Sequence, residues 1–212
     1  MILLTVTGCA APRLADSVAV YDFGPGNSQA PAVSAPAGRS TLLLSAPMAS
    51  VALEGSAVLY RLGYADAQQL KPYTLARWSA PPAQLIGLRL RQRLSQQRAV
   101  LAPGELLQSS QPQANQPPCA SATLLHLRLE LEEFSQLFDS PNTSHALLRL
   151  HATLTQRSAS SETLLAQRSF NLPRPAPTPD ASGGVRAMTA TADALVLELE
   201  TWLAQTEPSR CS

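Results

Sequence analysis

Histidine side chains are among the groups of this sequence that could do acid–base or metal chemistry. The three histidines are His126, His145 and His151, and their spacing does not match that of zinc ligands. His126 and His151 fall on the polar sides of two predicted strands, where at most a weak surface metal site could form. We expect ordinary exposed histidines and no bound metal.

The acidic side chains and the absence of catalytic motifs also argue against an active site. The cluster of Glu130, Glu132 and Glu133 fits the solvated face and end of a strand better than a pair of catalytic carboxylates. The segment GPGNS at 24–28 lacks the lysine and the following helix of a phosphate-binding loop, and neither GxSxG nor HExxH occurs. We therefore predict no catalytic residues, no cofactor and no enzymatic activity.

Cys9 has the clearest predicted chemistry. The chain begins MILLTVTGCAAP, with an apolar run that ends at Gly8 and Cys9. This arrangement resembles the lipobox of bacterial lipoproteins, in which the chain is cut before the cysteine and the thiol is acylated. No basic residue precedes the run, which is at the short limit of the roughly 7–15 residues of a signal core. The alternative is a buried N-terminal strand with an incidental cysteine.

The other two cysteines are Cys119 and Cys211. If Cys9 carries lipid, they remain as an even pair in a chain that would face an oxidising periplasm. A disulfide between them would close a loop of about 93 residues and contribute about 4 kcal/mol in the chain-entropy model. The alternative is two independent thiols.

Composition bounds the class and the domain organisation. A formal net charge of +1 over 212 residues argues against a general nucleic-acid binder, and no run of 18 apolar residues could span a bilayer. The segment SQAPAVSAPAGRS at 28–40 is rich in Pro, Ala, Ser and Gly. It should behave as a flexible tether, because it buries too little apolar surface to offset its conformational entropy. We predict a signal-peptide remnant at 1–8, a lipidated N-terminus and tether at 9–39, one domain at 40–206 and a tail at 207–212.

Strand and helix patterns predict the elements of that domain. Period-2 alternation indicates strands at 40–46, 56–64 and 70–78, read as an antiparallel meander, and at 122–134, 144–157 and 162–172. Loops are expected at 108–118 and 173–184. Helical spacing predicts a C-terminal helix over 184–205. Its apolar stripe is Met188, Ala192, Leu195, Val196, Leu199, Trp202 and Leu203.

The first helix is expected between 78 and 98, with Ser79 as its cap and two prolines in its first turn. The segment LRLRQRL also alternates like a strand, but its length and its good helix formers favour a helix. The predicted apolar stripe is Ala83, Ile86, Gly87, Leu90 and Leu94.

The predicted fold is α+β: a single domain with a largely antiparallel sheet and two helices on one face, in the order strands, helix, strands, helix. The two helices carry complementary charges on their flanks, although exposed ion pairs contribute little each. The charged residues are Arg89, Arg91, Arg93 and Arg98 on the first helix, and Asp193, Glu198 and Glu200 on the second.

A motif in the first half of the domain resembles a known family. Tyr-Arg in a strand, a second strand ending in Arg-Trp, a Pro-Pro helix entry and a helix of leucines and basic residues are similar to the ABC-type transport auxiliary lipoproteins, the paraquat-inducible type that accompanies MCE proteins. YDFGP at 21–25 and RSFNLP at 168–173 extend the match over nearly the whole chain. The motif residues are Tyr60, Arg61, Arg77, Trp78, Pro81 and Pro82, with Tyr73 between them.

The resemblance implies a non-enzymatic lipoprotein that faces the periplasm and is held in the outer membrane by acyl chains on Cys9. Its partner would be the MCE-domain protein of an ABC transporter that moves phospholipid or other lipids, and direct phospholipid contact stays open. Ala10 fits the outer membrane, since bacterial sorting usually retains lipoproteins with Asp at that position. The rival interpretation is an anchored scaffold for envelope assembly without a role in lipid transfer.

The motif also has a physical interpretation. Trp78, just before a proline-initiated helix, is expected to be a core residue that fixes the helix on the sheet. Arg61 and Arg77 could pair with acidic residues of the chain or with carboxylates of a partner, because a guanidinium offers bidentate geometry. A hydrolase would need Ser, His and acidic groups that converge on a pocket, and no spacing in the sequence suggests one.

Overall fold

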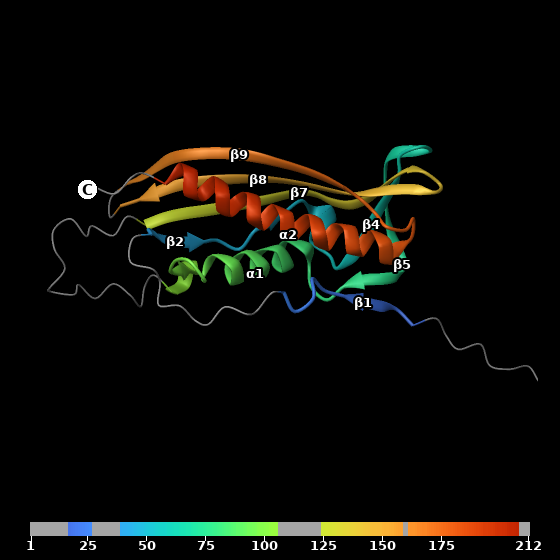
Figure 1. The fold of residues 1–212 in the computed structure, drawn as a ribbon, viewed down its shortest axis with the longest axis horizontal. Helices are drawn as coiled ribbons and strands as arrows, with labels where there is room; N and C mark the ends of the chain where they lie inside the picture. Colours follow the sequence, from blue (N-terminus) through green and yellow to red (C-terminus); the bar gives the residue numbers. More distant parts are fainter. Residues whose placement is uncertain (1–16, 27–38, 106–123, 159–160, 208–212) are drawn as a thin grey trace, which may run out of the picture.

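The computed structural model describes residues 17–26, 39–105, 124–158 and 161–207, and it confirms the predicted α+β fold and order of elements (Figure 1). Nine strands form one sheet, and two helices pack on it. The strands are β1 (Ala19–Tyr21), β2 (Thr41–Leu44), β3 (Met48–Ala49), β4 (Ala57–Leu62), β5 (Asp66–Trp78), β6 (Val100–Leu101), β7 (Leu124–Ser140), β8 (Thr143–Arg157) and β9 (Glu162–Pro175), and the helices are α1 (Pro82–Leu94) and α2 (Ala181–Thr206).

The long strand β7 organises the sheet. Its 17 residues span about 56 Å, so three short strands pair with it in parallel, one after another along its length: β2, then β3, then β4. The hairpins β4–β5, β7–β8 and β8–β9 are antiparallel. The predicted antiparallel meander is confirmed for its second and third strands, β4 and β5. It is wrong for the first, because β2 pairs in parallel with β6 and β7 and not with β4.

Bulges modify the predicted alternation at two places. Register shifts in the β4–β5 hairpin leave both Val58 and Leu59 buried and turn Tyr73 toward the core. A shift in the β7–β8 pair between Leu131 and Glu133 brings Phe134 into the core. Glu133 stays opposite the exposed Arg149 on the outer face of the sheet, as predicted, but it is buried there beside Arg61. An added residue reverses the side-chain direction beyond it, so a strict period of two does not hold past either point.

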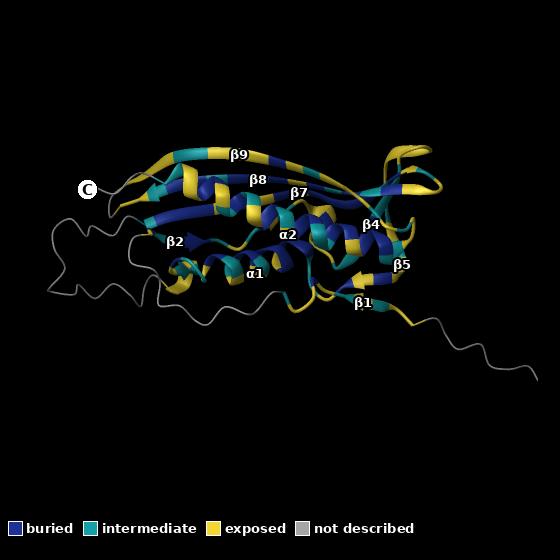
Figure 2. Cartoon of the chain, viewed as in Figure 1, coloured by how far each residue is buried: buried dark blue, intermediate teal, exposed yellow. Residues whose placement is uncertain are grey.

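The helices lie side by side on one face of the sheet, and the hydrophobic core fills the layer between the helices and the sheet (Figure 2). Both predicted apolar stripes are buried, which confirms the helical interpretation of 82–94. Helix α1 begins at Pro82 with Pro81 as N-cap and no side-chain cap. Ser79, the predicted cap, instead donates its backbone N–H to the Tyr21 carbonyl.

Helix α2 begins at Ala181, three residues before the predicted start, because the Asp180 carboxylate accepts a 2.7 Å hydrogen bond from Gly183 N and caps it. Strand β9 continues to Pro175, so the predicted loop at 173–184 shortens to 176–180. At Gly184 a Cβ would overlap the side chain of Gln136. The glycine thus permits the close approach of the helix to β7.

Two predicted boundaries move. Residues 19–21, assigned to the tether, form β1 and pair with the end of β5, and Phe23 is buried in the core. Glu207, assigned to the tail, caps α2 and pairs with Arg98. The predicted lipidation site Cys9 and the predicted disulfide cysteines Cys119 and Cys211 lie outside the described residues.

Candidate partner-binding site

The motif residues gather at one end of the sheet. Tyr60 and Arg61 lie on β4, Tyr73, Arg77 and Trp78 lie on β5, and Pro81 and Pro82 lead into α1. The β4–β5 hairpin and the short β5–α1 connection bring these segments together. Their side chains have different surroundings, so the structure separates internal roles from external ones.

Trp78 is buried in the core, as its structural interpretation predicts, with 1% of its surface exposed. Its ring centroid lies 5.5 Å from that of Phe23, in an edge-to-face arrangement, and 5.6 Å from that of Phe134. Trp78 therefore joins the segment after β1, the strand β7 and the start of α1. Pro82 is buried at the first position of the helix.

Arg61 is engaged within the chain. Its guanidinium lies 3.0 Å from the buried Glu133 carboxylate and donates to the carbonyls of Ala67 and Gln68. Glu133 also accepts a 2.7 Å hydrogen bond from the Ser135 hydroxyl, and Arg149 lies 3.6 Å away. Arg61 thus compensates a buried carboxylate and braces the β4–β5 hairpin.

The two motif tyrosines form part of a polar link across the sheet. The ring centroids of Tyr60 and Tyr73 are 4.5 Å apart. The Tyr73 hydroxyl donates to Gln136 Oε1 at 2.8 Å, and Gln136 Nε2 donates to the Ser144 hydroxyl at 2.7 Å. Burial raises the pKa of Tyr73 well above its usual value. The hydroxyl therefore keeps its proton and acts as a donor at neutral pH.

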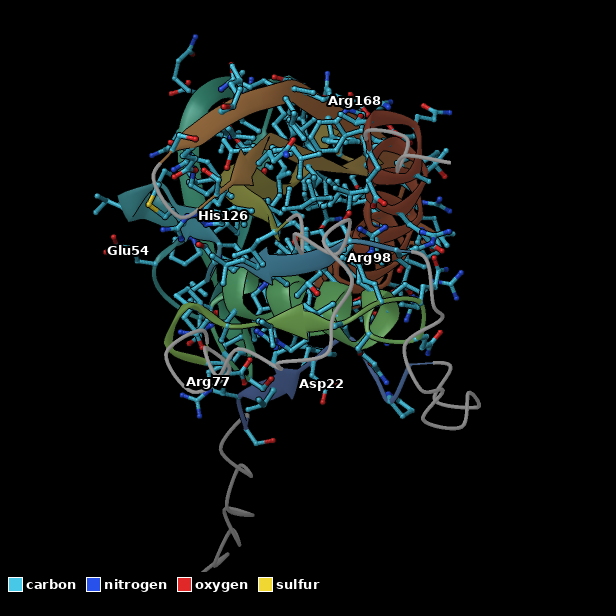
Figure 3. All side chains as sticks on the ribbon, turned by 90° about the vertical axis from the view of Figure 1, so that its left-hand side faces the viewer. Asp22, Glu54, Arg77, Arg98, His126 and Arg168 are labelled. Atoms are coloured by element: carbon cyan, nitrogen blue, oxygen red, sulfur yellow. The ribbon has the colours of Figure 1, made fainter. Side chains whose placement is uncertain are left out.

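Arg77 is the motif side chain that points outward (Figure 3). It pairs in register with Val20, and Ala76 and Trp78 on either side of it face the core. Within the described ranges it makes no ion pair. We call the surface formed by Val18, Val20, Leu75 and Arg77 the β1–β5 face, and it is the part of the motif region that is open to a partner.

The predicted charge complementarity between the helices is confirmed in part. Arg89 lies 3.2 Å from Asp193, Arg93 lies 2.8 Å from Glu200, and Arg98 pairs with Glu207. The other predicted charges, Arg91 and Glu198, form ion pairs outside the contact between the two helices. Arg91 lies 3.9 Å from Glu105, and Arg168 lies 3.5 Å from Glu198.

Two cavities flank helix α1. One of about 450 Å³ lies between the helices, with Arg89, Arg93 and Asp193 among its polar lining residues. Arg89 also donates to the Phe23 carbonyl and so holds the segment after β1 against the helices. The other, of about 330 Å³, has a mostly apolar lining that includes Leu88.

A serine, a histidine and an acid converge although the sequence suggests no such site. The Ser45 hydroxyl lies 2.7 Å from His126 Nε2, and His126 Nδ1 lies 3.4 Å from Glu162 Oε1. These residues come from the β2–β3 connection, β7 and β9, so no local sequence spacing predicts that they lie together. The prediction that His126 is exposed is wrong, since only 8% of its surface is accessible.

The order serine, histidine, acid is that of an activated nucleophile, but its placement favours a structural role. Leu42 and Leu44 belong to the core beneath the helices, whereas Leu43 lies beside His126 in register. Strand alternation therefore places the Ser45 hydroxyl on the sheet face opposite the helices, although Ser45 also belongs to the lining of the cavity of about 330 Å³. We interpret the cluster as a polar link that joins β2, β7 and β9.

The cluster predicts a pH dependence of stability. Burial lowers the pKa of His126 below its ordinary value of 6.5, although Glu162 partly opposes this shift. The unfolded chain then binds the proton more readily, so the free energy of unfolding should fall as the pH drops below about 6.5. Urea unfolding between pH 7.5 and 5.5 measures this slope. A His126→Gln variant should show a smaller slope, and an unchanged slope would contradict the assignment.

The described residues contain no cluster of His, Cys, Asp and Glu that could hold a metal ion. Neither described helix combines the length and apolar character needed to cross a bilayer. The fold and the candidate site thus define a single-domain α+β protein in which the motif region contributes Arg77 to the exposed β1–β5 face.

The chain belongs to the family of ABC-type transport auxiliary lipoprotein components, whose model matches residues 21–200. This is a family of auxiliary transport components and not an enzyme family, and it indicates a location in the cell envelope. The sequence has no match among curated proteins.

Solved structures share the fold. Protein XCC0632 from Xanthomonas campestris is 19% identical, with a TM-score of 0.62 over 90% of this chain and 94% of the other. An uncharacterised protein is 12% identical, with a TM-score of 0.57 over 88% of this chain and 99% of the other. At these identities the likeness extends to the architecture alone.

Proposed function

We propose that this protein is a non-enzymatic lipoprotein, anchored in the outer membrane through acylated Cys9, that serves as a periplasm-facing adaptor of an ABC transporter with an MCE protein. Its role would be to assist the movement of phospholipid between the two membranes. The observation that carries the proposal is the family match over residues 21–200, which begins 12 residues after the Gly8-Cys9 pair.

The arrangement of the chain supports the anchor. The described fold begins at Ser17, close behind Cys9, so an acylated Cys9 would hold the domain near the membrane surface. One acyl chain gives only reversible attachment, whereas several chains on one cysteine hold firmly. Ala10, in place of Asp, favours the outer membrane. The domain itself would then act by binding.

Replacing Cys9 with serine tests the anchor. We expect the wild-type protein to fractionate with outer membranes and the Cys9→Ser variant to lose this association, because the serine cannot take the thioether-linked lipid. Cys119→Ser is the matched control and should stay with the membrane. A Cys9→Ser variant that remains membrane-bound, or an unacylated wild-type N-terminus by mass spectrometry, would refute the proposed anchor.

The partner requires its own measurement. Crosslinking of the wild-type protein in intact cells, followed by purification and mass spectrometry, should recover an MCE-domain protein. Recovery of envelope-assembly proteins without an MCE protein would instead favour the scaffold interpretation.

A further inference from the structure

Apolar side chains on the β1–β5 face are exposed without serving the core. Val18, Val20 and Leu75 expose 44%, 53% and 45% of their surface. Val20 lies beside Arg77 in the parallel pairing, and Leu75 precedes the paired Ala76 as Val18 precedes its partner Ala19. The three apolar side chains and the guanidinium therefore share one side of a two-stranded edge.

The opposite side of the same two strands provides the packing. Ala76 and Trp78 are buried, and Tyr21 packs against the core. The stability of the edge therefore comes from the inner side chains, and polar residues at 18, 20 and 75 would serve it equally well. Apolar groups beside an arginine that forms no ion pair with any described residue are the composition of a surface that meets a membrane interface, where aliphatic groups enter the headgroup boundary and the guanidinium binds phosphate.

The position of this face in the chain identifies its occupant. Ser17, where the described structure begins, follows Cys9 by eight residues, and eight residues span at most about 29 Å when fully extended. If Cys9 is acylated, as the proposed function holds, the β1–β5 face lies within that distance of the bilayer. The lipid surface is then the partner available to it in every anchored molecule.

We propose that the β1–β5 face rests on the phospholipid bilayer and orients the domain. Val18, Val20 and Leu75 contact the headgroup boundary, and Arg77 binds lipid phosphates. Asp22, which follows β1, is exposed, and its carboxylate accepts a hydrogen bond from Gly24 N at 2.7 Å and forms no ion pair with a described residue. The helices α1 and α2, which pack on the opposite side of the sheet, are thereby left accessible from the periplasm.

Depth-dependent quenching tests this orientation. The full-length acylated protein, with Cys119→Ser and Cys211→Ser, receives a single environment-sensitive fluorophore at Val20→Cys and is reconstituted into vesicles of phosphatidylethanolamine and phosphatidylglycerol that contain spin-labelled lipid. Leu164→Cys on β9, whose parent side chain is 56% exposed, is the matched control. We expect at least threefold stronger quenching at position 20 than at position 164. Leu75→Cys provides a second site if the first variant folds poorly.

The outcomes separate this inference from the anchor. Equal quenching at positions 20 and 164 in vesicle-bound protein overturns the orientation while the anchor stands. Protein that fails to associate with vesicles refutes the proposed anchor itself. A label at position 20 that is already shielded from aqueous iodide without vesicles shows that protein covers the face, which also overturns the inference. An Arg77→Glu variant should lose most of the quenching difference, whereas Arg77→Lys should retain it.

Discussion

Replacing Trp78 with alanine should lower the free energy of unfolding by about 3–5 kcal/mol, the range found when large core aromatics are truncated. The ring is almost fully buried and contacts Phe23 and Phe134. Its removal would leave a cavity where β5, β7 and the segment after β1 meet the start of α1. Urea unfolding followed by circular dichroism measures the change.

Two companion variants make this prediction specific. Trp78→Phe keeps an aromatic ring and should cost clearly less than the alanine change, because it leaves a smaller cavity and because Trp78 Nε1 has no hydrogen-bond acceptor in the described structure. Val20→Ala on the exposed side of the same edge should change stability by no more than about 0.5 kcal/mol. A Trp78→Ala loss below about 1 kcal/mol would show that the ring does not join these elements.

Removing the charge of Arg98 should also destabilise the domain strongly. The Arg98 side chain is fully buried and pairs with Glu207, which is 15% exposed. Arg98→Met fills much of the same volume but leaves the Glu207 carboxylate without its partner. Breaking a buried ion pair from one side typically costs about 3–5 kcal/mol. Because Glu207 keeps some contact with water, we expect about 3 kcal/mol in equilibrium unfolding.

A double-mutant cycle separates the pair from simple packing. Glu207→Gln alone should be destabilising, because it leaves the buried guanidinium of Arg98 without a counter-charge. The double variant Arg98→Met with Glu207→Gln should then lose less than the sum of the two single changes, by about 1–3 kcal/mol. Additive losses would mean that the two residues are not coupled and that the C-terminal ends of α1 and α2 are held by apolar contacts alone.

Local periodicity accounts for the elements that were predicted correctly. The stripes from Ala83 to Leu94 and from Met188 to Leu203 repeat every three or four residues, which places them on one side of a helix whatever its neighbours are. The leucines from Leu125 to Leu131 alternate over an uninterrupted segment, and all four positions are buried as predicted. The opposite charges on the helix flanks are complementary only if the helices lie side by side, and the structure places them so.

The candidate site was predicted only as a set of residues. Family resemblance indicated Tyr60, Arg61, Arg77 and Trp78, but a sequence motif does not distinguish a side chain that supports the fold from one that is open to a partner. The structure assigns Arg61 to the buried Glu133 and Trp78 to the core, and it leaves Arg77 on the surface. That division depends on which segments lie opposite each residue.

The sequence by itself determined the helices, the long alternating strand and the class of fold, because these follow from side-chain periods that act over a few residues. Only the tertiary structure decided that β2, β3 and β4 share β7, that bulges turn Tyr73 and Phe134 toward the core, and that His126 meets Ser45 and Glu162. Strand partners and bulges are selected by packing between residues far apart in the chain. Local secondary-structure propensity therefore does not predict which strands pair or where the bulges lie.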